Sequence, residues 1–277
     1  MKSLHTDIDK NQEAGLELIL TKEISLIHAP WVRQGKTRDM AKGLFLFYKW
    51  RLCAGESAGF GLPVWRTAQQ TYFPSLISIK SIGNTIIEEE FRMDRVLIWR
   101  IAGKKFPDWV SRTIEHLVNV YMKRPTLQIR LLKLRHIVLK SFAIESAMMP
   151  GSDQGFCRVV YEATARGLHV RVEGRSFQGQ GQLIVLNEVD GQSFTRLRVC
   201  ERILHDVEIS SWQAVPFEAI LESPLLDLGI SLSPGSGRDI WPCRVYCGRE
   251  VSLGLDWAGF AVMSKESVVD YQVHFHA

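Results

Sequence analysis

Hydrophobic and polar residues alternate with a period of two along much of the chain. Near the C-terminus, Val269, Tyr271 and Val273 fall on one side of an extended segment, and polar residues occupy the positions between them. The stretch 251–258 repeats this alternation. Such a period places successive side chains on opposite faces of a strand, one packed and one wetter. Short segments of the same kind recur from Leu16 onwards, which predicts a chain built from β-strands.

Turn signals separate these segments. Asp190-Gly191 lies between the apolar runs 183–186 and 194–199, and this dipeptide favours the type I′ turn of a tight hairpin. Arg166-Gly167 separates two further runs in the same way. Short strands at near-regular spacing predict one all-β domain over residues 1–277, mainly antiparallel, folded as a large barrel or a curved β-sandwich. The alternative, a doubly wound α/β sheet, requires helices between successive strands, and the pattern does not provide them.

One region breaks the alternation and predicts an insertion of one or two helices near residues 106–142. Pro107-Asp108 suits the first turn of a helix, because proline is preorganised there and aspartate interacts favourably with the helix dipole. Thr126 suits the cap of a second segment, 126–142, whose apolar residues recur at helical spacing. Residues 127–131 also alternate as in a strand, so both interpretations of 126–142 stay open.

Composition places the chain among ordinary globular proteins. Hydrophobic residues make up 46% and charged residues 23%, and 13 Phe, 8 Trp and 6 Tyr provide bulky side chains for a core or a pocket wall. No apolar run approaches the roughly 20 residues that span a bilayer, and the first residues do not resemble a signal peptide. Five scattered cysteines without a C-x-x-C pair favour reduced thiols over a disulfide framework. We therefore expect a soluble, cytoplasmic protein.

The net charge of +4 is distributed unevenly. The segment 92–140 contains twelve Lys or Arg and three Asp or Glu, a local charge of +9, which leaves 22 basic and 27 acidic residues elsewhere. We expect no nucleic-acid partner, because these cations are interleaved with aliphatic side chains rather than with stacking aromatic ones. An alternative function that the segment supports is weak association with an anionic membrane surface.

The five residues Gly55–Gly59 spell G-x-S-x-G, which resembles the nucleophile elbow of the α/β-hydrolases. The resemblance implies a serine ester hydrolase in which Ser57 is the nucleophile and His205 or His274 is the base. The elbow requires a helix after the serine, whereas Gly61 and Pro63 follow here. The other interpretation is a glycine-rich connection between strands, and the sequence leaves open whether the protein is an enzyme.

Two further clusters favour structural roles. Glu88, Glu89 and Glu90 form an acidic run that is typical of a charged edge strand. His274 and His276 would share one strand face, but metal binding would need a third ligand from another element. We expect no metal site and no cofactor.

The favoured function is binding of a small ligand, partly apolar or anionic, in an aromatic-lined cavity of the β structure. Such sites form near strand ends, with apolar walls and a few oriented polar groups. The sequence does not predict an oligomeric state. The candidate ligand-binding residues combine aromatic rings, arginine and carboxylates near predicted strand ends: Glu56, Trp65, Tyr72, Arg249, Glu250, Asp256 and Trp257.

Overall fold

The computed structural model of the chain describes residues 16–28, 41–55, 57–101, 104–105, 144–205, 212–235, 242–252 and 255–277. Within these ranges the chain forms strands, turns and loops, and no helix. The strands are β1 (Glu17–Ile19), β2 (Ile24–Ile27), β3 (Phe45–Tyr48), β4 (Arg51–Leu52), β5 (Phe60–Thr67), β6 (Thr71–Ile82), β7 (Ile86–Ile101), β8 (Lys104–Lys105), β9 (Ile144–Pro150), β10 (Phe156–Thr164), β11 (Gly167–Arg175), β12 (Gly181–Val189), β13 (Arg196–Val199), β14 (Arg202–His205), β15 (Gln213–Val215), β16 (Ile220–Ser223), β17 (Leu228–Pro234), β18 (Arg244–Ser252), β19 (Leu255–Ser264) and β20 (Val268–His276).

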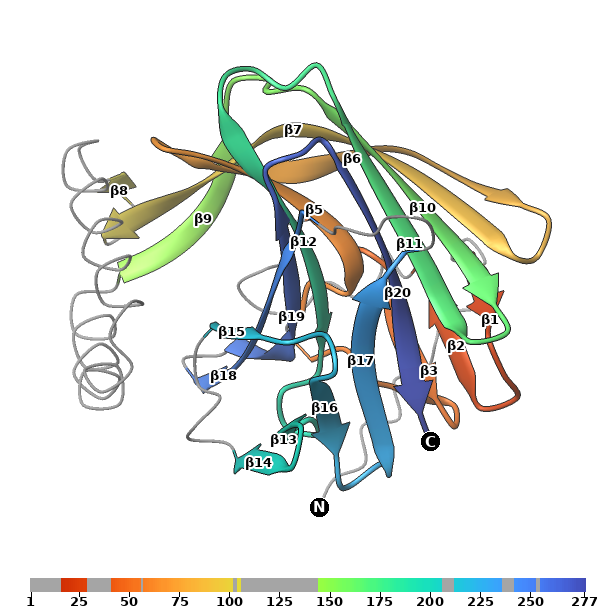
Figure 1. Cartoon of the computed structure of the whole chain (residues 1–277). Coiled ribbons are helices and arrows are strands. Elements are labelled where there is room, and N and C mark those ends of the chain that lie inside the picture. The colour runs from red at the N-terminus through yellow and green to blue at the C-terminus, as the bar shows by residue number, and fades with distance from the viewer. Residues whose placement is uncertain are drawn as a thin grey trace, which may run out of the picture.

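Antiparallel pairing arranges these strands in two sheets (Figure 1). The small sheet has four strands in chain order, from β1 to β4. The large sheet has sixteen strands in the order β14-β13-β16-β17-β20-β11-β10-β7-β6-β5-β12-β19-β18-β15, with β8 and β9 paired to β7. The prediction of an all-β, mainly antiparallel fold is confirmed.

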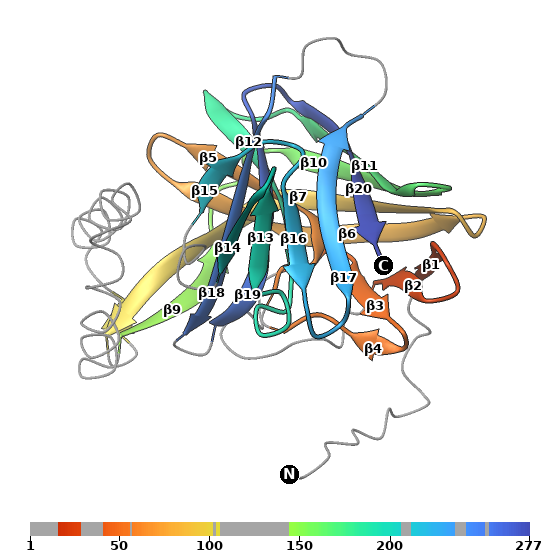
Figure 2. The same cartoon turned by 60° about the horizontal axis from the view of Figure 1, so that its bottom comes forward.

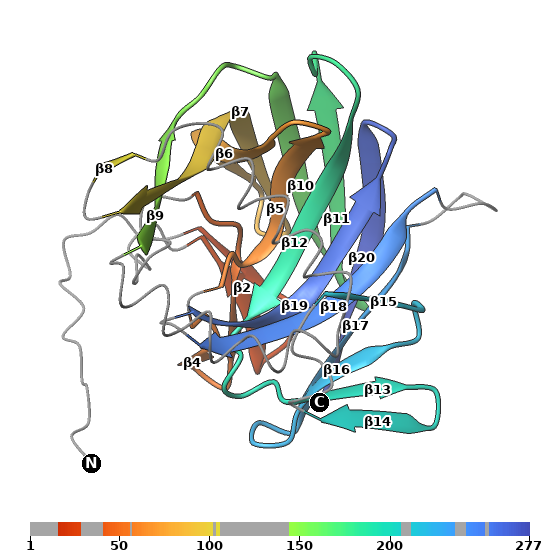
Figure 3. The ribbon, with the colours of Figure 1, turned by 90° about the vertical axis from the view of Figure 1, so that its left-hand side faces the viewer.

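The large sheet is strongly curved but does not close into a barrel (Figure 3). The strands β19 and β20 follow each other in the chain, yet β19 pairs with β12 and β18, whereas β20 pairs with β11 and β17. A strand has two hydrogen-bonding edges, and both edges of each of these strands are in use. The sheet therefore continues beyond β19 and β20 into two separate ends.

Alternate side chains of the curved sheet form its core. On β10, β11 and β20 buried residues alternate with partly exposed ones over most of each strand, which confirms the alternation expected at the C-terminus. Tyr161 pairs with Val170, and Val170 pairs with Tyr271, so the two tyrosines lie at one level of the sheet. Large side chains fill this interior, including Tyr161, Tyr271, Phe60, Phe91 and Phe260, each of them almost fully buried.

The two predicted hairpins have different outcomes. Arg166-Gly167 does join two paired strands, β10 and β11, and Gly167 has φ of +138°. The hairpin at Asp190-Gly191 is wrong, because β12 pairs with β5 and β19, and β13 pairs with β14 and β16. The Asp190 carboxylate accepts hydrogen bonds from the backbone N–H groups of Gln192 and Ser193 (2.7 and 3.3 Å), and this local cap turns the chain away from β12.

Two other predictions concern single segments. The alternating stretch 251–258 does not form one strand, because Val251 at the end of β18 pairs with Asp256 on β19. The predicted helical insertion near 106–142 lies outside the described residues. Among the described residues, no helix is long and apolar enough to cross a membrane.

Candidate functional site

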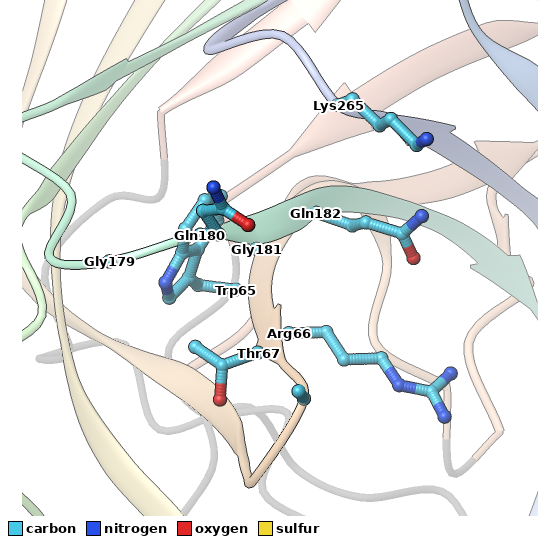
Figure 4. Close-up of a pocket in the computed structure, with 9 residues that line it drawn as sticks. Trp65, Arg66, Thr67, Gly179, Gln180, Gly181, Gln182 and Lys265 are labelled. Atoms are coloured by element: carbon cyan, nitrogen blue, oxygen red, sulfur yellow. The ribbon is translucent and has the colours of Figure 1, made fainter.

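A hollow of about 820 Å³ lies where the ends of β5, β12 and β19 come together (Figure 4). We call it the Trp65 hollow. Its wall comes from the end of β5, from the chain entering β12 and from the turn after β19. The residues that line it include Trp65, Arg66, Gln180, Gly181, Gln182 and Lys265.

Strand register aligns three polar side chains of the hollow in a row. Arg66 on β5 pairs with Gln182 on β12. Lys265 directly follows Ser264, whose partner is Leu183, so Lys265 continues the row beside Gln182. Figure 4 shows the three side chains extending in the same direction. Neighbouring strands are about 4.8 Å apart, so the strands that carry the guanidinium and ammonium groups lie about 10 Å apart, with the carboxamide of Gln182 between them.

Trp65 forms the aromatic part of the wall. Its ring stacks on Phe177 with a centroid distance of 4.0 Å and an interplanar angle of 19°. Its indole Nε1 is buried and has no hydrogen-bond partner. Gly181 lies against the ring, and a Cβ atom at this position would come within 2.5 Å of Trp65 Cζ2. The glycine therefore allows β12 to begin beside the indole, whose buried N–H is left without a partner.

The predicted ligand-binding residues fall into two groups at opposite ends of the strands. Trp65 lines the hollow, and Tyr72 is its partner on β6. Trp257 lies on β19 seven positions before Ser264, which is at the level of Trp65, so the two groups are separated by about 23 Å along the strands. Arg249, Glu250 and Asp256 lie with Trp257 at the far end of β18 and β19.

In the group at the far end of β18 and β19, Arg249 and Asp256 form hydrogen bonds with the turn at 190–193. Arg249 Nε donates to the Gly191 carbonyl at 2.6 Å, and backbone N–H groups of that turn donate to the Asp256 carboxylate. Burial, together with nearby Asp190, raises the pKa of Asp256. Trp257 stacks on Trp212 at a centroid distance of 4.6 Å. These contacts hold a loop in place, whereas Glu56 lies outside the described residues.

The G-x-S-x-G segment connects β4 to β5, and no helix follows it. Gly55 and Gly59 have φ of +53° and +76°, and a Cβ on either would come within 2.8 Å of a backbone oxygen of β19 or of Leu44. The glycines are thus required by close packing of the chain. Ser57 is 1% exposed, and its Oγ has no hydrogen-bond partner. A nucleophilic serine needs a base within hydrogen-bond reach, and neither His205 nor His274 provides one.

Replacing Ser57 by alanine tests this interpretation. We expect unchanged hydrolysis of p-nitrophenyl acetate and a free energy of unfolding that is equal or up to about 1 kcal/mol higher, because the variant removes a buried hydroxyl without a partner. Urea denaturation and the esterase assay measure the two quantities. A loss of esterase activity in a folded Ser57→Ala protein would restore the hydrolase hypothesis.

A chain of polar groups crosses the core. His28 Nδ1 lies 2.8 Å from Glu89 Oε1, and Tyr161 Oη lies 3.0 Å from Glu89 Oε2 and 2.9 Å from the Phe60 carbonyl. Glu89 is fully buried, which raises the pKa of its carboxyl group. A tyrosine hydroxyl has one proton for these two acceptors. A neutral Glu89 that donates to Tyr161, while Tyr161 donates to Phe60, satisfies every atom.

These hydrogen-bonded polar groups continue on the other side of Gly61. The Gly61 N–H donates to Asn187 Oδ1 at 3.2 Å, and Tyr271 Oη donates to the same oxygen at 2.7 Å. Asn187 Nδ2 is buried without a partner.

The sequence interpretation of Glu88–Glu90 as an edge strand is wrong, because β7 lies between β6 and β10 and directs Glu89 into the core. Its position between buried Ile87 and Phe91, at a period of two, was the signal available in the sequence.

Glu188 is a second buried carboxyl group. Its Oε2 accepts a hydrogen bond from the Ala58 N–H at 2.7 Å, and Lys42 Nζ donates to the neighbouring Ser57 carbonyl at 2.8 Å. Burial raises the pKa of Glu188 to about 7, although the Ala58 N–H and the charge of Lys42 act in the opposite direction. This carboxyl group fastens the 55–59 connection to β12.

Two histidines of β20 are engaged with the neighbouring strand β17. His274 and His276 on β20 lie 2.7 and 2.8 Å from the hydroxyls of Ser233 and Ser231 on β17. Within the described ranges, no three His, Cys, Asp or Glu residues gather in a way that could hold a metal ion.

Comparison with protein-family models, with curated proteins and with solved structures gave no match.

Proposed function

We propose that the protein binds a small anionic molecule with an apolar part in the Trp65 hollow. The observation that carries the proposal is the row Arg66–Gln182–Lys265 on three neighbouring strands, at the rim of a hollow whose lining also includes Trp65. The lining includes two cations and no acidic side chain. A carboxylate or phosphate would accept from the row, and the apolar part would contact Trp65.

Location also bears on the proposal. Aromatic side chains fill the interior of the curved sheet, so we assign the ligand to its strand ends.

The reducing compartment expected from the cysteines stays a prediction. It is consistent with the five free cysteines, Cys53, Cys157, Cys200, Cys243 and Cys247.

A matched pair of probes tests the proposal. 2-Naphthoate and 2-naphthamide have similar shapes, and only the first is an anion. We expect naphthoate to bind at least about tenfold more tightly in isothermal titration calorimetry, because only its carboxylate forms charge-assisted hydrogen bonds. Raising the salt concentration should weaken naphthoate binding, since the cations are partly exposed. Equal affinity for the two probes would contradict the proposal.

Variants locate the site. Lys265→Gln and Arg66→Gln should each weaken naphthoate binding about five- to tenfold, since each removes a charged donor. Trp65→Phe should weaken it while keeping the stack on Phe177, because it removes only the indole N–H and part of the ring. Arg196→Gln is the control, since Arg196 is an exposed cation on β13, outside the hollow. Equal losses in Arg196→Gln and Lys265→Gln would place the binding elsewhere.

A further inference from the structure

The connection between β3 and β4 places a tryptophan in an unfavourable backbone conformation. Tyr48 pairs with Arg51, so Lys49 and Trp50 alone form the turn, with φ of +47° and +66°. Two-residue turns with positive φ at both positions favour Asn-Gly or similar pairs. A bulky residue in this conformation is strained, and such strain is found where a side chain is needed for function.

The Trp50 side chain is 91% exposed, although the turn beneath it is well fixed. The Lys49 N–H donates to the Glu23 carbonyl at 2.8 Å. Lys49 Nζ lies 3.7 Å from Glu23 Oε2 and 4.8 Å from the centre of the Tyr48 ring, and Tyr48 is buried. The β1–β2 turn and the β3–β4 turn thus support each other, and the indole projects from a rigid base.

The small sheet, which carries the turn with Trp50, has a partly exposed face that is mainly apolar. The register aligns Ile19, Ser25, Phe47 and Leu52 across its four strands. Ile19 is 65% exposed, and the other three are partly exposed, whereas their neighbours Leu18 and Leu46 are buried on the opposite face. Figure 2 shows the small sheet at the margin of the molecule, with β4 at its end.

The same tip is cationic. Lys22, Lys49 and Arg51 are exposed there, and Glu23 is the nearby carboxylate, so three positive charges and one negative charge give +2. The Lys49–Glu23 pair is internal to the tip, which leaves Lys22 in the β1–β2 turn and Arg51 next to Trp50 as the net positive charge.

We propose that this tip, formed by Ile19, Lys22, Lys49, Trp50 and Arg51 and called the Trp50 tip, binds the surface of an anionic lipid bilayer. Tryptophan prefers the membrane–water interface, where the ring lies among apolar groups and its N–H stays near water. The flanking cations are attracted to anionic headgroups. A protruding indole fits a fluid interface that can deform around it, whereas a protein partner would need a matching pocket. This site is distinct from the basic segment 92–140.

Flotation with vesicles tests the proposal. The full chain should float with vesicles of phosphatidylcholine and phosphatidylserine, less with phosphatidylcholine alone, and less at high salt. Trp50→Gly should lower the partition coefficient about tenfold, because it removes the burial of a large aromatic side chain. Glycine tolerates positive φ, so this variant should melt at the same temperature or higher, which separates lost binding from lost folding. Lys22→Gln with Arg51→Gln should weaken binding only to the anionic vesicles.

Leu225→Ser is the matched control, since Leu225 is also exposed (70%) but lies in the β16–β17 turn. It should float as the unmodified chain does. The proposal is overturned if the chain floats with neither vesicle, or if Trp50→Gly floats as well as the unmodified chain. The second result would assign membrane binding to another part of the protein, such as 92–140. A change of oligomeric state in Trp50→Gly, without any vesicle binding by the unmodified chain, would assign the tip to a protein contact.

Discussion

Gly61→Ala should lower the free energy of unfolding by about 3–8 kcal/mol, enough to prevent folding of a marginally stable domain. Gly61 is the extra residue of a β-bulge between Phe60 and Leu62, opposite Leu186 and Asn187, and its φ is +78°. An added Cβ would lie 2.4 Å from Tyr161 Cε1 and 2.7 Å from its hydroxyl oxygen. The ring cannot move aside without breaking its bonds to Glu89 and the Phe60 carbonyl.

Gly83→Ala separates the backbone cost of this change from the steric one. Gly83 also has positive φ, +62°, but no atom lies within 4 Å of the added Cβ. We expect it to lose only about 1–2 kcal/mol. Urea denaturation of both variants gives the comparison, and failure of Gly61→Ala alone to accumulate as folded protein agrees with the same prediction. Equal losses in the two variants would show that Tyr161 does not restrict this position.

Glu188→Gln should change how stability depends on pH by about 3 kcal/mol between pH 4.5 and pH 7. The folded-state pKa of Glu188 is raised to about 7 from an ordinary value of 4.5. In that interval the unfolded chain loses a proton that the folded chain keeps, so this group makes the protein less stable as pH rises, by about 1.4 kcal/mol per pH unit. Glutamine keeps an oxygen for the Ala58 N–H and does not titrate.

The measurement is the difference in unfolding free energy between Glu188→Gln and the unmodified chain across this interval, because other groups cancel in it. The variant should gain relative stability as pH rises. Glu88→Gln should show almost no pH dependence in this interval and the opposite trend below pH 4.5, since Arg158 and Lys80 lower the pKa of Glu88 from its ordinary value of 4.5. A difference that does not depend on pH in Glu188→Gln would contradict the assigned pKa.

Local patterns in the sequence predicted local structure well. The inward residues of β20 and the hairpin at Arg166-Gly167 follow from alternation and from one glycine with positive φ. The sequence did not predict the partners of β12. Asp190-Gly191 has the composition of a hairpin turn, but its aspartate side chain caps the following backbone instead. Pairing of β12 with β5 joins residues more than a hundred positions apart, and no local signal specifies that choice.

The sequence predicted only part of the candidate site, again because local patterns do not specify which strands pair. Trp65 was identified as an aromatic residue near a strand end, which is a local property. Arg66, Gln182 and Lys265 were missed, because they come together only through the register of three strands that are distant in sequence. Glu89 was misassigned since an acidic run resembles an edge strand, and its burial depends on two distant partners, His28 just after β2 and Tyr161 on β10.

The strand order also bears on how this chain behaves in a crowded solution. A sheet of sixteen strands that stays open exposes backbone groups to which another chain could add. Here the order ends in β14 and β15, which have four and three residues. The part of β6 beyond its pairing with β5 is another open edge, and it carries Pro74, Lys80 and two register shifts. Because short, kinked and charged edges are poor templates, we expect the edges at β14, β15 and β6 to resist the addition of a strand from another chain.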